Sequence, residues 1–414
     1  MKAVQNLVQR DHRIAGLGTI LDPERLVSAV HAQLGRAVID QARLDYIRYK
    51  PGMNCIARYV VRVADKTVNA YAKAHGPDAQ CKMGKSSIRK ASDTTFGPGR
   101  ILLDDENIVF SFFPNDAKIK AMQSLVDEGK RERLLSNVFG QDRRPDNVEF
   151  DKPLNYKPER RYVVRLKCGG TDFALVKFHT RQGYHRALCN QPGTNLIGHC
   201  ERRAVIAYRW IAGETLRDVC ISGRMEPFHI DATARALSEF HSGATEAMAL
   251  PDRSAQIDAI ESLGAQIGFL LPHLQTRAVR VARKLAAWLD NHRPVQSPVH
   301  GDFYDKQVVI RDNGAVLIDM DEARLDDPLV DVGNFIAHME RQVVSRVLSR
   351  SQCQQQTEAL ISSYRLYGGV VSEPQLRGFL ALGLFRLLHQ PFRDFEESWP
   401  ERIQEILTRV EKLI

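Results

Sequence analysis

Residues 297–323 read SPVHGDFYDKQVVIRDNGAVLIDMDEA and place carboxylates around two short aliphatic runs. The runs QVVI and AVLIDM are typical of β-strands, and Asp312-Asn313-Gly314 between them is a turn signal. Paired strands hold the side chains at their ends in fixed positions. We therefore predict a rigid hairpin that presents polar groups to a substrate.

The polar groups around this hairpin suit phosphate chemistry. Asp302 lies in the loop HGDFYDKQ, the amide of Gln307 follows five residues later, and Asp319 comes just after the second strand. Oxygen ligands suit Mg²⁺, which combines one or two protein carboxylates with substrate phosphates. If Gln307 and Asp319 bind the metal, Asp302 is left to orient and deprotonate a hydroxyl, an arrangement that predicts phosphoryl transfer.

The whole chain has the composition of an ordinary folded protein. It has 414 residues, 43% of them hydrophobic and 26% charged, which suggests two or three domains. The N-terminus has no apolar core of signal-peptide length, and the later run FLALGLFRLL is short and contains Arg386. We therefore expect a cytoplasmic protein with no membrane partner. The seven cysteines are scattered without a CxxC pair, so no zinc site or disulfide framework is expected.

The net charge of +8 is unevenly distributed along the chain. Residues 1–223 contain 37 Lys and Arg against 24 Asp and Glu. These basic residues are dispersed among strand-like and helix-like segments and are not gathered with aromatic residues on one element. We therefore expect no nucleic-acid partner.

Two segments of this basic half share one plan. YKPGMNCIAR (49–58) and YKPERRYVVR (156–165) both contain Tyr-Lys-Pro, six residues and Arg. Each continues to a second strand with a lysine, Lys73 or Lys177, and then to a further apolar hairpin. The agreement in order and spacing predicts a duplicated β-rich unit. Lys177 would supply a fixed positive charge for nucleotide phosphates, with a solvated strand lysine as the alternative, whereas Lys73 is expected to be a surface residue.

After Gly223 the sequence is mostly helical, except for the hairpin described above. The segment VHGDFYDKQVVI followed by LIDMDEARLDDPLVDVGNFIAHM resembles the catalytic core of the aminoglycoside phosphotransferase-like family of small-molecule kinases. IAYRWIAGETL resembles the hinge of that family, ALSEFHSGA its helix before the catalytic loop, and PFRDFEESWPER a common C-terminal helix region. His241 in this helix is expected to pack or form hydrogen bonds and not to bind metal.

The resemblance covers about residues 155–414 and implies an α+β, protein-kinase-like fold of two lobes. We expect a β-rich N-lobe at 150–212 and a mostly helical C-lobe at 213–414 that carries the catalytic loop. Before them, residues 1–145 would form an extra β-rich cap domain that partly duplicates the N-lobe. This added cap also resembles the one found in bacterial maltokinases.

The resemblance also implies roles for individual residues. Asp302 would be the catalytic base, Gln307 and Asp319 the Mg²⁺ ligands, and Lys177 the lysine that contacts the phosphates. Asp331 would brace the catalytic loop, and Asp321 and His300 are candidates for accessory roles. The remaining candidates would contact the nucleotide, ATP or another NTP, through phosphates or adenine: Arg160, Arg161, Tyr208, Trp210 and Ile211.

The sequence departs from the family pattern at three places. Gln307 stands where Asn is usual, and it keeps the ligand oxygen with one more methylene. The segment RQGYHRALCNQPGTN after Lys177 contains no Asp or Glu, so the usual acidic partner of that lysine is absent from it. The phosphate loop lacks glycines and would use Arg160, Arg161 or backbone amides. Trp210 is expected in the core more than as an adenine platform, and Asp305 and Glu322 are expected to face solvent or the substrate cleft.

These residues predict transfer of phosphate from ATP or another NTP, with Mg²⁺, to a hydroxyl of a small molecule. Residues 331–414 contain ten acidic and ten basic groups, which favours a neutral sugar or sugar alcohol over a polycationic antibiotic. The alternative is a catalytically silent kinase-like protein that binds nucleotide or has a regulatory role. The duplicated unit could also form the surface of a homodimer.

Overall fold

The computed structural model describes residues 2–77, 91–141, 146–189, 195–244 and 248–414 and divides into two compact units. The β-rich unit contains residues 1–185, 194–210 and 392–397. The helical unit contains residues 186–193, 211–391 and 398–414. The chain has the mixed α+β composition that was expected.

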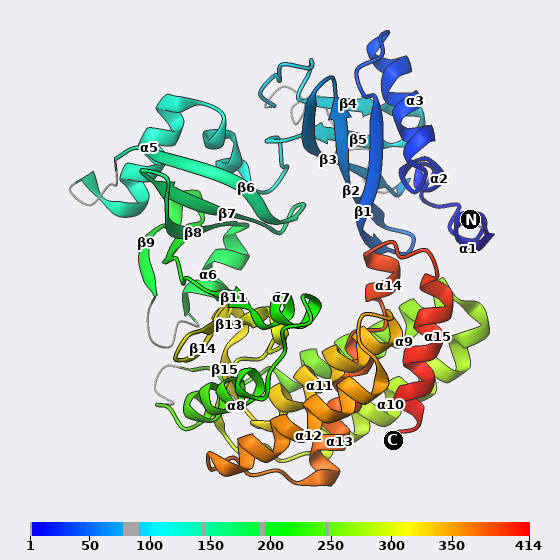
Figure 1. Cartoon of the computed structure of the whole chain (residues 1–414). Helices are drawn as coiled ribbons and strands as arrows, with labels where there is room; N and C mark the ends of the chain where they lie inside the picture. The colour runs from blue at the N-terminus through cyan, green and yellow to red at the C-terminus, as the bar shows by residue number, and fades with distance from the viewer. Residues whose placement is uncertain (1, 78–90, 142–145, 190–194, 245–247) are drawn as a thin grey trace. The chain divides into compact units, whose positions relative to one another are not determined.

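The first part of the β-rich unit is an antiparallel sheet of five strands in the order β1-β2-β3-β5-β4 (Figure 1). Its strands are β1 (Gln41–Lys50), β2 (Asn54–Val63), β3 (Lys66–His75), β4 (Arg100–Leu103) and β5 (Ile108–Phe112). Three helices precede them, α1 (Lys2–Arg10), α2 (Leu17–Ile20) and α3 (Pro23–Leu34). The side chain of Asp22 caps α3 by accepting hydrogen bonds from the amides of Glu24 and Arg25, as the Asp-Pro sequence predicts.

A second antiparallel sheet has the corresponding order β6-β7-β8-β10-β9. Its strands are β6 (Val148–Lys157), β7 (Arg161–Cys168), β8 (Thr171–His179), β9 (Leu196–Cys200) and β10 (Val205–Arg209), with helix α6 (Arg181–Cys189) after β8. In each sheet the last two strands are joined by a short 3₁₀ turn, Asp104–Glu106 or Glu201–Arg203. Each turn ends at a residue with positive φ, Asn107 or Ala204.

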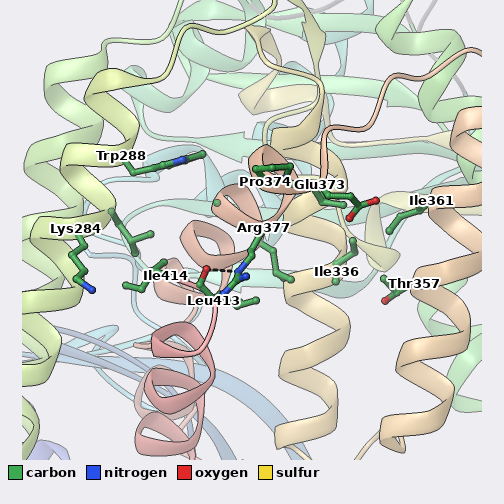
Figure 2. Close-up of a pocket in the computed structure, with 14 residues that line it drawn as sticks. Lys284, Trp288, Ile336, Thr357, Ile361, Glu373, Pro374, Arg377, Leu413 and Ile414 are labelled. Atoms are coloured by element: carbon green, nitrogen blue, oxygen red, sulfur yellow. Dashed lines mark hydrogen bonds between the residues drawn. The ribbon is translucent and has the colours of Figure 1, made fainter.

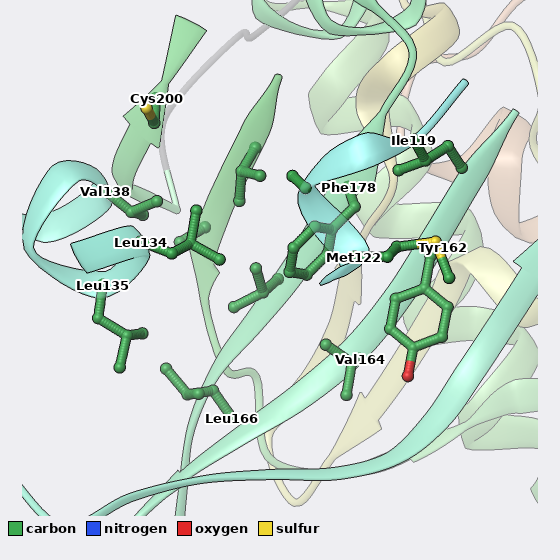
Figure 3. Packing of buried hydrophobic residues seen from close by; sticks show 14 of the residues in the cluster. Ile119, Met122, Leu134, Leu135, Val138, Tyr162, Val164, Leu166, Phe178 and Cys200 are labelled. Carbon is green, nitrogen blue, oxygen red and sulfur yellow. The ribbon is translucent and has the colours of Figure 1, made fainter. Parts of the chain in front are cut away.

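One hydrophobic core serves both sheets. Figure 3 shows the part of it that the second sheet and the segment between the sheets contribute. Ile56 and Tyr71 contribute to it from the first sheet, and Val164 and Phe178 from the second. The segment between the sheets completes it through the 3₁₀ helix Lys120–Leu125 and helix α5 (Glu128–Phe139). The β-rich unit is therefore held together by burial of apolar surface from both halves.

The helical unit contains the hairpin that the sequence predicts. Strands β13 (Val308–Arg311) and β14 (Gly314–Leu317) pair antiparallel around the Asn313-Gly314 turn, and β11 (Glu214–Thr215) extends them to three strands. Strands β12 (Ser297–Val299) and β15 (Arg324–Asp326) form a separate pair. These short strands hold both ends of the loops in which the candidate site residues lie.

Helices form the rest of the helical unit (Figure 1). They are α7 (Leu216–Ile221), α8 (Pro227–His241), α9 (Arg253–Leu270), α10 (Gln275–Asn291), α11 (Leu329–Val344), α12 (Arg350–Leu366), α13 (Glu373–Arg386) and α15 (Trp399–Glu411). The short helix α14 (Gln390–Arg393) has residues assigned to each of the two units. Pro272 separates α9 from α10, because proline favours the start of a new helix. Within the described ranges, no helix combines the length and the apolar character needed to cross a membrane.

Candidate functional site

The loop that contains Asp302 is held by a buried carboxylate. Asp331, near the start of α11, is fully buried and accepts hydrogen bonds from the backbone amides of His300 (2.6 Å) and Gly301 (2.8 Å). Two amides bound to one carboxylate fix the backbone immediately before Asp302. Asp302 is itself half-buried, so its side chain remains accessible.

His241, at the end of α8, supports the same carboxylate. Its Nε2 atom lies 3.0 Å from Asp331 and its Nδ1 atom 2.7 Å from the hydroxyl of Tyr364. This confirms that His241 forms hydrogen bonds in the interior. Burial alone would raise the pKa of Asp331, but the hydrogen bond and charge of His241, together with His300, more than offset this, so that the pKa lies below its ordinary value.

The two expected metal ligands lie side by side. The amide nitrogen of Gln307 donates a hydrogen bond of 3.3 Å to the carboxylate of Asp319. The two segments are also linked through the backbone, because the amide of Ile318 donates to the carbonyl of Gln307 (2.9 Å). The His300 ring contacts the carbonyl of Ile318 (2.8 Å). Asp319 has φ of 64°, in the left-handed region, which turns the chain sharply after β14.

This pair fits a hard cation. In the part of the chain that the structure describes, no three His, Cys, Asp or Glu side chains cluster as metal ligands. A cation at Gln307 and Asp319 would therefore depend on one carboxylate, one amide oxygen after reorientation of that amide, and oxygens from a substrate or water. This ligand set is the one that Mg²⁺ prefers.

The expectation that Asp305 faces solvent or the cleft was wrong. Its side chain is buried, and it forms an ion pair with Arg217 (2.7 Å) and accepts a hydrogen bond from Gln342 (2.9 Å). Burial raises the pKa of Asp305, although Arg217 and Gln342 act in the opposite direction. Asp305 therefore anchors the loop that contains Asp302 to α7 and α11. Glu322 is exposed, as expected, and contacts Arg186 at 3.3 Å.

Lys177 lies in the second sheet, in the β-rich unit. It pairs with Ile206 across strands β8 and β10, and its side chain is buried. Its ammonium group lies 4.9 Å from the centre of the Tyr208 ring, within the range of a cation–π interaction. The alternative of a solvated strand lysine was therefore wrong.

The turn between β6 and β7 contains Arg160, which is exposed, and Arg161, the first residue of β7, is half-buried. The preceding residue, Glu159, is buried and has φ of 57°. Its carboxylate binds Lys73 of the first sheet at 2.9 Å, with Arg48 at 3.6 Å. The expectation of a surface role for Lys73 was wrong, because this lysine connects the first sheet to the turn of the second.

The expected hinge begins at the end of β10. Trp210 donates a backbone hydrogen bond to Phe173 (3.0 Å), and its half-buried ring is covered by the guanidinium group of Arg165, 5.3 Å from the ring centre. Trp210 is thus packed under an arginine and is not a fully buried core residue. Ile211 and Asp321 belong to the helical unit, where Ile211 is half-buried and Asp321 is buried.

A large cavity of the helical unit lies away from these residues. It has a volume of about 810 Å³ and is lined by α10, α13 and the C-terminal residues, including Trp288, Leu376 and Ile414 (Figure 2). None of the candidate site residues lines it. Size alone therefore does not identify the site.

Three supporting residues had not been identified from the sequence. Arg217 and Gln342 bind Asp305, and Tyr364 binds His241. Each lies on a different helix, so no sequence motif joins these residues to the loop. Asn334 lies in the recognised segment DVGN, and its amide donates to the carbonyl of Phe303 (2.9 Å). The asparagine of this motif could have been identified from the sequence as a residue that supports the loop containing Asp302.

Residues 157–365, just over half of the chain, match the family described as "Phosphotransferase enzyme family". The chain belongs to this phosphotransferase family. This confirms the resemblance of the catalytic segment. No curated protein matches the chain.

Two solved structures are among those similar to this chain. A choline/ethanolamine kinase family protein from Mesorhizobium loti has 14% identity and a TM-score of 0.49, over 70% of this chain and 94% of its own. Spectinomycin phosphotransferase APH(9)-Ia, in complex with ADP and spectinomycin, has 12% identity and a TM-score of 0.43, over 69% and 92%. These TM-scores are below 0.5, so membership of the family rests on the sequence match.

Proposed function

We propose that this phosphotransferase transfers the γ-phosphate of ATP, or of another nucleoside triphosphate, to a hydroxyl group of a small molecule. The single observation that carries the proposal is the position of Asp302. Its loop is fixed by Asp331 on one side and by Asp305 on the other, while Asp302 itself stays accessible. A carboxylate held in this way is suited to orient a hydroxyl and accept its proton.

In the proposed reaction, a bond forms between the acceptor oxygen and the γ-phosphorus, and the bond from that phosphorus to the β,γ-bridging oxygen breaks. The acceptor proton passes to Asp302, and the nucleoside diphosphate leaves. Lys177, Arg160 and Arg161 would bind phosphate oxygens. A Mg²⁺ ion held by Gln307 and Asp319 would offset the negative charge of the phosphates.

Within this proposal, residues 150–212 form the N-lobe, residues 213–414 the C-lobe, and residues 1–145 a cap domain that partly duplicates the N-lobe. The identical strand order of the two sheets supports the duplication. Backbone groups of Tyr208, Trp210 and Ile211 would contact the base of the nucleotide. Asp321 and His300 have accessory roles. The His300 ring contacts the carbonyl of Ile318 and so links the loop that contains Asp302 to the segment that contains Asp319.

The test is transfer of labelled phosphate from ATP to a bacterial metabolite extract with Mg²⁺. Asp302→Ala should lower product formation by about 10²-fold to 10⁴-fold, because the general base is lost, while nucleotide binding is retained. The matched control is Asp312→Ala, which removes an exposed carboxylate from the β13–β14 turn of the same hairpin. Equal turnover by the wild type and Asp302→Ala would exclude Asp302 from the mechanism.

A kinase-like protein that binds nucleotide without turnover is the second candidate. The observation that favours it is helix α6, which follows Lys177 and contains no acidic residue. Tight binding of Mg²⁺–ATP by both the wild type and Asp302→Ala, with no labelled product from any extract, would support this second function. The acceptor in the first proposal is a sugar or a sugar-like metabolite.

A further inference from the structure

Helix α10 has a cationic side next to its buried side. Its sequence, QTRAVRVARKLAAWLDN (275–291), repeats buried apolar residues at helical spacing: Ala278, Val281, Ala282, Leu285, Ala286 and Leu289. Four of the residues between them are cationic and at least partly exposed: Arg277, Arg280, Arg283 and Lys284. Asp290 is the only acidic residue of this helix and follows Lys284 by six positions. The middle of α10 therefore carries an excess of positive charge.

Neighbouring helices balance only part of this charge. The carboxylate of Glu411, at the end of α15, binds Arg277 at 2.6 Å and Arg280 at 3.0 Å. Arg283 and Lys284 are exposed, and neither forms an ion pair within 4.0 Å with any described residue. Both cations are therefore available to an anion from outside the chain.

Lys284 lines two cavities of the helical unit. One has a volume of about 520 Å³, and Arg280 and Arg283 line it together with Lys284. The other residues that line this smaller cavity are uncharged: Gln275, Thr276 and Val279. The second is the cavity of about 810 Å³ described above, which Lys284 borders from α10. A cationic cavity and the larger cavity thus share one lysine.

The larger cavity has mainly apolar walls. Figure 2 shows Trp288 of α10 on one side of it and Ile361 of α12 on the other, with Ile336 of α11 between them in this view. The ring of Trp288 lies directly against α13, because a Cβ atom at Gly378 would be 2.2 Å from its Cζ2 atom. Leu376 of α13 is buried beneath the cavity. A hydrocarbon chain placed here would be removed from water on several sides, which is favourable.

The charged residues of this larger cavity also favour an anion. Its acidic side chain, Glu373, is paired with Arg365 at 2.7 Å. The guanidinium group of Arg377 donates to the backbone carbonyls of Leu413 (2.7 Å) and Lys412 (2.9 Å), so these bonds leave its positive charge in place (Figure 2). The charge around the cavity is therefore complementary to a ligand with an apolar body and an anionic end.

We propose that this cavity binds a fatty acid, with the hydrocarbon chain between α10, α11, α12 and α13 and the carboxylate at Lys284 and Arg283. Sites for small molecules typically have volumes of about 300–1,000 Å³, apolar walls and a few polar groups that orient the ligand. The cavity of about 810 Å³ has these properties. None of the candidate site residues lines it, so the fatty acid is not the phosphate acceptor and the inference does not depend on the proposed function.

The first experiment varies the ligand. Octanoate, decanoate and dodecanoate are titrated into the full chain by calorimetry, and decan-1-ol and acetate serve as controls that each lack one half of the ligand. We expect saturable binding of one fatty acid per chain, with affinity that rises about threefold to fourfold for each added methylene group, as burial of that group predicts. Decan-1-ol should bind at least about threefold more weakly than decanoate, because it forms no ion pair, and acetate should not bind.

The second experiment varies the protein. Lys284→Glu should weaken decanoate binding by about threefold to tenfold, since an exposed ion pair is replaced by repulsion, and should leave the affinity for decan-1-ol unchanged. The matched control is Arg350→Glu, the same change of charge at an exposed residue of α12 that lines neither cavity. This control should bind both ligands as the wild type does.

A third variant, Ile361→Trp, tests the position of the hydrocarbon chain. The larger ring would fill the space between α12 and α10, so binding of decanoate and of decan-1-ol should both be lost, and thermal unfolding checks that the variant folds. Should it not fold, Lys284→Glu decides the outcome by itself. The proposal would be overturned by the absence of saturable binding in the wild type, by equal affinities for decanoate and decan-1-ol, by unchanged decanoate affinity in Lys284→Glu, or by full binding in folded Ile361→Trp.

Discussion

His75 is the last residue of β3, and its burial makes the stability of the first sheet depend on pH. Burial, and next the charge of Lys73, lower its pKa to about 4 from an ordinary 6.5, while Glu159 acts in the opposite direction. The folded protein therefore binds this proton less tightly than the unfolded chain does. Between pH 6.5 and pH 4 the unfolded state gains more protons, so stability falls as the pH falls.

We therefore expect His75→Gln to reduce this acid sensitivity. Relative to the variant, the wild type should lose about 1–2 kcal/mol of stability between pH 6.5 and pH 4, less than the full shift implies because the ring is half-buried and partly screened. Thermal unfolding of both proteins over this pH range measures the difference. Parallel Tm profiles would show that His75 does not contribute.

For single residues, the sequence predicts contacts between side chains of one motif better than contacts between side chains that only the fold brings together. Asp302, Gln307 and Asp319 lie within one loop and hairpin, so their spacing alone predicts that Gln307 and Asp319 face each other. The burial of Asp305 depends on Arg217 and Gln342, which are distant in sequence and lie on different helices. Local patterning contains no information on such contacts.

Helix α11 is the element that connects packing to the site. It carries Asp331, which holds the loop that contains Asp302, and two residues later Gly333 packs against helix α13. A Cβ atom at Gly333 would lie 2.8 Å from the backbone and the Cβ atom of Phe379 and 2.9 Å from the amide nitrogen of Leu380. Glycine here allows two helix backbones to approach closely.

We expect Gly333→Ala to destabilise the protein by about 1–3 kcal/mol, because overpacking forces the two helices apart. Turnover should fall as well, since α11 positions Asp331. At the exposed Gly129, in the first turn of α5, the added methyl group would make only an ordinary van der Waals contact, 3.8 Å from a carboxylate oxygen of Asp127. Gly129→Ala should stabilise by about 0.5–1 kcal/mol through helix propensity. Thermal unfolding of both variants tests this contrast, and shifts of the same sign would contradict it.

Element boundaries were largely predictable where local chemistry sets them. Asp22 and Pro23 mark the start of α3, and Asn313-Gly314 marks the hairpin turn, because capping and turn residues act over three or four positions. The predicted second strand AVLIDM extended too far. Strand β14 ends at Leu317, since Asp319 adopts positive φ to place its side chain next to Gln307.

At the scale of the β-rich unit, the shared core of its two sheets was not predictable from the sequence. The repeated Tyr-Lys-Pro segments indicated two similar units, but not that Tyr71 and Tyr156 would meet edge to face with ring centres 6.5 Å apart. Asp116, from the segment between the sheets, also binds the hydroxyl of Tyr156 (3.0 Å) and the amide of Glu159 (2.8 Å). Such contacts join residues about 40 or more positions apart, beyond the reach of periodicity.

The first sheet therefore supports the turn that contains Arg160. The buried carboxylate of Glu159 binds Lys73 at 2.9 Å, and both side chains are largely withdrawn from solvent. Removing one partner of a buried ion pair leaves an uncompensated charge. Arg48 at 3.6 Å and Lys118 at 3.7 Å offset part of that loss.

We expect Lys73→Met to destabilise the β-rich unit by about 2 kcal/mol, below the 3–5 kcal/mol typical of an isolated buried pair because two cations remain. If the turn binds nucleotide phosphates, the KM for ATP should also rise, since the backbone around Arg160 would be less well fixed. The control is Lys130→Met, which removes an exposed lysine paired with Asp127 at 3.1 Å and should cost no more than about 1 kcal/mol. Thermal unfolding and ATP titration of both variants provide the measurement. Equal effects of the two substitutions would mean that the first sheet does not support the turn of the second.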